Sequence, residues 1–145
     1  MALHNTLVLD ANILIRAVLS ANVRTLLEQS SSTIRFFAPD VCFNDAEKYL
    51  PPLFEKRNLP VESALEVLTG ISRIVQTVEA DVYDNYREEA IQRIAIRDPD
   101  DWPVVATALA LNCPIWTEDS DFLGSGIATW TTDRIHVFMT PTPNE

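Results

Sequence analysis

The stretch Arg97 to Phe122, RDPDDWPVVATALALNCPIWTEDSDF, decides the fold. A helix is predicted from Trp102 to about Leu111, because Asp101 stands at the N-cap, Pro103 falls in the first turn, and alanine, leucine and valine residues follow. Residues 114–117, Pro-Ile-Trp-Thr, then read as a buried strand. A helix that leads into a buried strand is typical of an α/β protein.

Acidic residues bracket this helix and strand. In α/β proteins, functional side chains gather beyond the carboxyl ends of the strands, so we expect one end of each acidic cluster to approach the other. Such an approach would build a cation site. The first cluster is Asp98, Asp100 and Asp101, and the second is Glu118, Asp119 and Asp121.

The N-terminal part of the chain has the order strand, acid and helix. Residues 6–9 are a short apolar run that favours a strand and stops at Asp10. The apolar residues in 12–19 then have helical spacing. Asp10 is therefore predicted at the carboxyl end of the first strand, facing the same crevice as the later acids.

The remaining segments complete an alternating pattern. Further strands are expected at 34–38, 73–78 and 135–139, with an extended segment at 127–131. Further helices are expected near 22–28, 39–50, 60–70 and 81–96. Pro51 and Pro52 should interrupt or kink the helix that begins at residue 39. This alternation predicts a three-layer α/β/α sandwich with a mainly parallel central sheet. We expect a single domain over residues 1–145, of which 140–145 form a frayed tail.

Composition narrows the class of protein. The chain has 11 basic and 21 acidic residues and a formal charge of −10, which argues against a non-specific nucleic-acid binder with a basic surface. Its two cysteines, Cys42 and Cys113, lie in apolar surroundings and indicate buried thiols in a reducing compartment rather than a zinc site. The chain shows neither a signal-peptide pattern nor an apolar run of membrane-spanning length, so we expect a cytoplasmic protein without membrane contact.

Several carboxylates in one crevice repel one another unless a cation is present. Mg²⁺ and Mn²⁺ suit ligands that are all oxygen, and the two histidines, His4 and His136, each stand alone. Such a cation lowers the pKa of a water and stabilises the transition state when a phosphodiester is cleaved. Each acid alone also has a structural interpretation as a helix cap, turn residue or solvated side chain; their joint placement at element ends favours the metal site.

The sequence resembles the PIN-domain family, the nuclease fold of VapC-type toxins. The resemblance covers residues 6–138 and depends on VLDANILIRAV, on DPDDWPVVATALALNCPIWTEDSDF and on an acidic helix between them. It implies that Asp10 is the first acid of the site, Asp101 the third with Asp98 beside it, and Asp119 the fourth with Asp121 nearby.

The second acid of the family pattern is normally a glutamate on an early helix, a few residues past a proline. Counting from Pro39 favours Asp45, whereas residue type favours Glu47. These two side chains point about 200° apart on a helix, so only one can face the site. We favour Asp45 and keep Glu47 as the alternative.

The sequence thus predicts a ribonuclease that hydrolyses RNA phosphodiesters with Mg²⁺ or Mn²⁺. Asp10, Asp101, Asp119 and Asp121 are the expected metal ligands, while Asp98 and one of the two helix acids bind metal or position the attacking water. The resemblance implies a toxin with an antitoxin partner and a homodimer, and leaves a solitary PIN protein open. Two alternatives remain: a catalytically silent PIN-like protein-binding module, and a phosphohydrolase of the haloacid-dehalogenase type.

Overall fold

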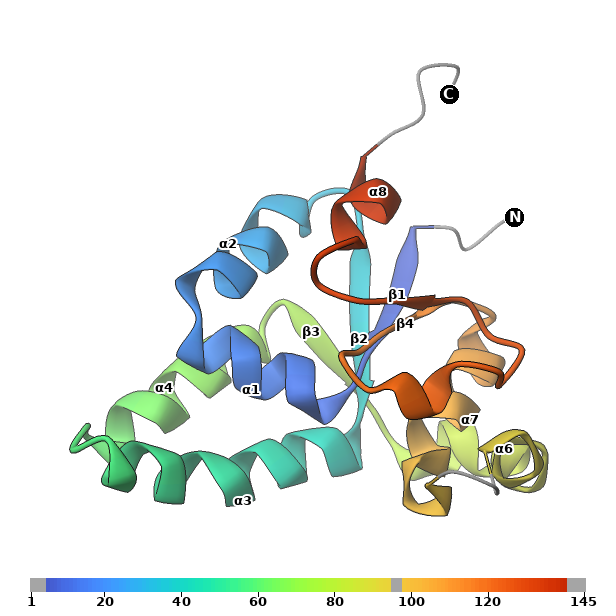
Figure 1. Cartoon of the computed structure of the whole chain (residues 1–145), viewed down its shortest axis with the longest axis horizontal. Coiled ribbons are helices and arrows are strands. Elements are labelled where there is room, and N and C mark those ends of the chain that lie inside the picture. The colour runs from blue at the N-terminus through green and yellow to red at the C-terminus, as the bar shows by residue number, and fades with distance from the viewer. Residues whose placement is uncertain (1–4, 95–97, 141–145) are drawn as a thin grey trace.

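The computed structural model describes residues 5–94 and 98–140. A parallel sheet lies between two groups of helices, which confirms the predicted three-layer α/β/α sandwich (Figure 1). The strands are β1 Thr6–Leu9, β2 Arg35–Pro39, β3 Val75–Val78, β4 Ile115–Trp116 and β5 Thr129–Trp130. The helices of one group are α1 Ala11–Leu19, α2 Ala21–Ser30, α3 Asp40–Lys56 and α4 Val61–Ile71. The other group contains α5 Ala80–Tyr83, η1 Asp84–Tyr86, α6 Arg87–Ile94, η2 Pro99–Asp101 and α7 Trp102–Leu111.

The strand order is β3-β2-β1-β4-β5, and every neighbouring pair is parallel. The chain winds outward from β1 through β2 to β3 and then returns to place β4 on the other side of β1. The winding therefore reverses between β1 and β4. A crevice opens outside the carboxyl ends of the strands at such a reversal, and ligands bind there in open α/β sheets.

Helix α7 is the most deeply buried helix of its layer, and six of its ten residues, Pro103 to Ala108, are inaccessible or nearly so. As the sequence predicted, α7 begins with Asp101 at its N-cap and Pro103 in its first turn. It is capped at its C-terminus by Asn112, which adopts a left-handed conformation with φ 52°. Because α7 packs on β1, β2 and β4, its first residue is held rigidly beside the sheet. The start of α7 is where the predicted acids lie.

Helix α3 continues through Pro51 and Pro52, although these residues were expected to interrupt or kink it. A proline removes the hydrogen bond to the carbonyl group four residues earlier. Those carbonyl groups belong to Glu47 and Lys48, which are both exposed. Water can satisfy them there, so the helix runs on to Lys56.

Two sequence predictions were wrong. Residues 135–139 form helix α8 (Ile135–Met139) and not a strand; the buried Ile135 and the half-buried Phe138 and Met139 also fit helical spacing, and a short apolar run does not distinguish the two periods. The helix expected over 81–96 is divided into α5, η1 and α6, because Tyr83, not Val82, turns into the core. Residues 95–97 lie outside the described residues, as does the predicted tail of 140–145 from residue 141 onward.

Candidate metal centre

Asp10 lies where the chain leaves β1, directly beside the end of β4. Its backbone N–H donates to the carbonyl oxygen of Trp116 at 3.1 Å, which continues the ladder between the two strands. Asp10 is also the N-cap of α1, and its Oδ1 accepts from the Ala11 N–H at 2.7 Å. The carboxylate is therefore fixed by strand pairing on one side and by a helix cap on the other, and only 7% of the residue is exposed.

The second oxygen of Asp10 belongs to a network that links β1 to β4. Asp10 Oδ2 accepts from the Thr117 hydroxyl at 2.8 Å and from the Asn12 side-chain amide at 3.1 Å. Thr117 is fully buried, and its oxygen also accepts from the Asp119 N–H at 2.9 Å. Asn12 Oδ1 accepts from the Glu118 N–H at 3.2 Å. These bonds hold the loop after β4 against the end of β1.

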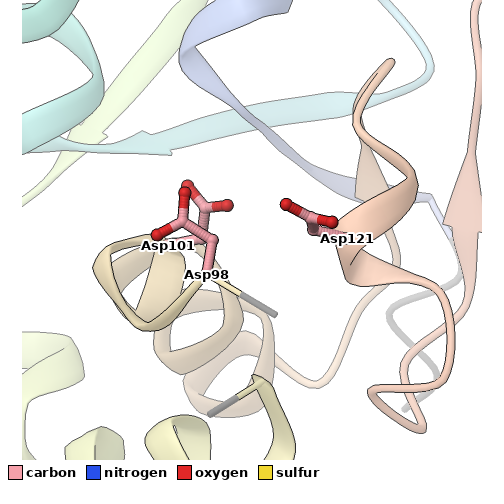
Figure 2. Close-up of side chains that lie close together, drawn as sticks. All are labelled: Asp98, Asp101 and Asp121. Atoms are coloured by element: carbon pink, nitrogen blue, oxygen red, sulfur yellow. The ribbon is translucent and has the colours of Figure 1, made fainter. Parts of the chain in front are cut away.

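Three carboxylates converge opposite this network. One oxygen each from Asp98, Asp101 and Asp121 lies within 4.8 Å of the others, and all three side chains are half-buried. Figure 2 shows Asp98 and Asp101 on the turn that opens α7, with their carboxylates directed toward Asp121 on the facing segment. The two acidic clusters of the decisive stretch thus meet in space, as their positions in the sequence predicted.

Local turns place these carboxylates. Asp98 caps the short helix η2 by accepting from the Asp100 N–H at 3.1 Å. Asp119 caps the short helix η3 (Ser120–Phe122) by accepting from the Asp121 N–H at 2.9 Å. Asp98, which belongs to the cluster, and Asp119, which does not, therefore both have the structural role of turn caps. Such capping fixes the direction in which the rest of each turn points.

Asp101 is the group that most needs a ligand. It stands at the N-cap of α7, yet its side chain makes no capping bond. Its Oδ2 is buried and has no hydrogen-bond partner within the described part of the chain. Burial first, and then the negative charges of Asp10, Asp98, Asp119 and Asp121, raise the pKa of Asp101 to about 7. A divalent cation among these oxygens would remove both the unsatisfied acceptor and the repulsion.

Burial also raises the pKa of Asp10 above its ordinary value of 3.8, and the hydrogen bonds from Thr117 and Ala11 oppose the change. The charges of Asp119 and Asp45 contribute further to the rise. Two carboxyl groups of the site, Asp10 and Asp101, thus favour protonation for the same reasons, burial and neighbouring negative charges. The ligand atoms that Asp98, Asp101 and Asp121 offer are all carboxylate oxygens, so this cluster fits Mg²⁺ or Mn²⁺.

The structure separates the two candidates on α3. Asp45 is exposed, and its charge is felt by the Asp10 carboxyl. Glu47 lines a pocket of about 370 Å³ with Phe43 and with Leu65 and Leu68 of α4, on a different face of the helix. The role of either residue as the second acid stays a prediction.

Two polar residues of this region were not among the predicted site residues. By sequence, Thr117 is only a threonine at the end of a strand. In the structure its hydroxyl donates to Asp10 and accepts from the Asp119 N–H, and so links these two residues. Asp40 follows β2 as Asp10 follows β1, a signal that was available; its Oδ1 accepts from the Val41 N–H at 2.8 Å and from the Tyr83 hydroxyl at 2.6 Å. Asp40 thus anchors an aromatic side chain beside the carboxylates.

A parallel α/β domain with an all-oxygen acidic centre at its switch point is the class that the fold and the site define. A model of the PIN domain matches residues 8–140, and the chain therefore belongs to the PIN-domain family. PIN domains are generally nucleases, and they typically use divalent metals. No curated protein matched the sequence.

Among solved structures, the chain is similar to one described as VapBC2 from Rickettsia felis bound to a DNA fragment from its promoter. The identity is 14% and the TM-score 0.64, and the match covers 87% of this chain and 98% of the other. At this identity the likeness shows the shared fold. In the part of the chain that the structure describes, no helix combines the length and apolarity needed to cross a bilayer.

Proposed function

We propose that the protein is a metal-dependent endoribonuclease. The observation that carries the proposal is the convergence of Asp98, Asp101 and Asp121, with Asp10 close enough for its charge to raise the pKa of Asp101, in a member of a nuclease family. The buried, unpartnered oxygen of Asp101 supports a resident cation. Asp119 completes the set as the cap of the turn that carries Asp121.

A bound Mg²⁺ or Mn²⁺ would neutralise phosphate charge and acidify a water, which is the chemistry that hydrolysis of a phosphodiester needs. In this proposal Asp101 and Asp121 hold the cation together with Asp10, whose orientation the Thr117 hydroxyl and the Asn12 amide fix. Asp45 stands near enough to Asp10 to affect its pKa and is proposed to position the attacking water.

The geometry favours attack by water over a phospho-aspartate of the haloacid-dehalogenase type. In that type a second aspartate normally stands two residues after the first, and here the position is Asn12. Its amide is engaged with Asp10 and its side-chain oxygen with Glu118. It therefore serves as a clamp between strand ends, without a carboxyl group that could protonate a leaving group.

The test is cleavage of a mixed pool of structured and single-stranded RNA by the purified protein. We expect cleavage with Mn²⁺, loss of cleavage with EDTA, and loss in Asp10→Asn. Glu66→Gln, an acid-to-amide change on the exposed side of α4, is the matched control and should cleave as the wild type does. Intact RNA with every sample, despite calorimetric binding of Mn²⁺ to the wild type, would reject RNA as the substrate.

The likeness to the VapBC2 structure supports a narrower proposal, that the protein is the toxin of a toxin–antitoxin pair with an antitoxin partner and a homodimeric form. Induced expression of the wild type should then arrest growth, whereas Asp10→Asn should not. Light scattering of the purified protein tests the dimer. Normal growth with an active nuclease would identify a solitary PIN enzyme.

A further inference from the structure

An acidic protein that cleaves RNA must still bind a polyanion. The net charge of −10 and the carboxylates of the crevice repel phosphate groups, so a cation of fixed position beside the crevice is needed. Among the described residues, Arg16, Arg24 and Arg93 are already engaged with other groups of the protein. Arg16 pairs with Glu118 at 3.3 Å, and Arg93 pairs with Glu89 at 3.0 Å and donates to the Ser125 carbonyl oxygen at 2.7 Å.

Arg87 is held differently. Its guanidinium carbon lies 5.2 Å from the ring centroid of Trp102, and among the described residues no carboxylate lies within salt-bridge distance of it. Arg87 is exposed and is the first residue of α6, a place where the helix dipole gives a cation no stabilisation. Contact with the ring orients the guanidinium but leaves its N–H groups free for a bidentate contact with an anion.

The aromatic ring that Arg87 contacts, that of Trp102, adjoins the acidic centre. Trp102 directly follows Asp101 and opens α7. The Trp102 ring contacts the ring of Tyr83 edge-on, with centroids 5.6 Å apart. Tyr83 is 2% exposed, and its hydroxyl bonds to Asp40 at the end of β2. Contacts that begin at the sheet therefore fix the position of the arginine relative to the metal ligands.

Resting on the proposed function, we propose that Arg87, supported by Trp102, binds a backbone phosphate of the RNA next to the one at the metal centre. The bidentate geometry of a guanidinium matches a phosphate group, and an ammonium group in its place would bind as a point charge. The contact carries no sequence information, because it reads only the backbone. Arg87 thus offsets the repulsion that the carboxylates impose on the substrate.

The test uses Asp10→Asn as an uncleaving parent and measures binding of a labelled single-stranded RNA by fluorescence anisotropy over a salt series. Arg87→Ala should weaken binding about tenfold at low salt and reduce the salt dependence by about 0.7, the value for one phosphate contact on a single strand. Arg87→Lys should recover only part of the loss. In the cleaving protein, Arg87→Ala should raise KM more than it lowers kcat, and calorimetric Mn²⁺ binding should not change.

Arg57→Ala is the matched control, since it removes the same charge from an exposed arginine at the far end of α3. That helix is 17 residues or about 25 Å long, and it begins at Asp40 beside the centre. Equal binding by the Arg87 and Arg57 variants would overturn this inference while leaving the nuclease proposal intact. A parent that binds no RNA, together with a wild type that cleaves none, would overturn both.

Discussion

Replacing Asp101 by asparagine should stabilise the metal-free protein at the expense of its activity. In the absence of a cation the Asp101 carboxyl group is partly buried among other acids, and its pKa is raised to about 7. A raised carboxyl pKa means that the folded state favours the protonated form. The contribution of the Asp101 carboxyl group to folding stability is therefore fully present below pH 4 and is lost as the pH rises through about 7.

The magnitude follows from the difference between the ordinary value of 3.8 and the folded value of about 7. At 1.36 kcal/mol for each pH unit, full linkage would be roughly 4 kcal/mol. Because Asp101 is half-buried, solvent screens part of this repulsion, and we expect about 1–2 kcal/mol. The Asp101→Asn variant should therefore exceed the wild type by that amount at pH 8.5 and match it near pH 4.

Urea denaturation in EDTA at pH 4, 6, 7 and 8.5 measures this difference. Mn²⁺ at 100 times its dissociation constant should stabilise the wild type by about 2.7 kcal/mol and the variant much less. Asp100→Asn, a substitution at the exposed neighbour within η2, is the control and should follow the wild type. If Asp101→Asn is less stable than the wild type at pH 8.5 in EDTA, the idea that the metal-free cluster is under electrostatic strain is wrong.

Other substitutions test the remaining parts of the site. Thr117→Val keeps the shape but removes the hydroxyl that bridges two carboxyl-bearing turns; unfolding in urea should show a loss of about 1–3 kcal/mol, and calorimetry a weaker Mn²⁺ affinity. Asp45→Asn should lower kcat at least tenfold while Glu47→Gln leaves it unchanged, and the reverse order would assign the second acid to Glu47. Gly126→Ala should lower stability by about 1 kcal/mol or more in thermal unfolding, because φ is +83° and the new methyl group would lie 2.5 Å from the Arg93 guanidinium.

The meeting of the acidic clusters at the candidate site was predictable because local signals place their carboxylates. Asp10 ends a short apolar run that favours a strand, and Pro103, in the first turn after Asp101, marks where a helix starts. In a parallel sheet every strand delivers its carboxyl end to the same edge. Alternation of strands and helices was therefore enough to bring distant acids to one side of the molecule.

Signals of the same kind were ambiguous where an element is short. Residues 135–139 satisfy both a strand and a helical period, and the contact of Phe138 with Trp130, at 5.9 Å between ring centroids, accompanies the helix. The division of 81–96 likewise depends on Tyr83, which turns inward to reach Asp40, 43 residues earlier in the chain. A sequence pattern within a window of about 15 residues gives no information about a contact with so distant a residue.

The sequence by itself determined the family, the parallel α/β architecture and the positions of the acids at the ends of strands and at the start of α7, because these depend on residue type and on local periodicity. Only the tertiary structure decided which side chains face one another. It turns Asp45 and Glu47 to different faces of α3, makes Thr117 the link between two strand ends, and lays Arg87 on Trp102. These relations join residues that are distant in the chain, and long-range packing fixes their directions.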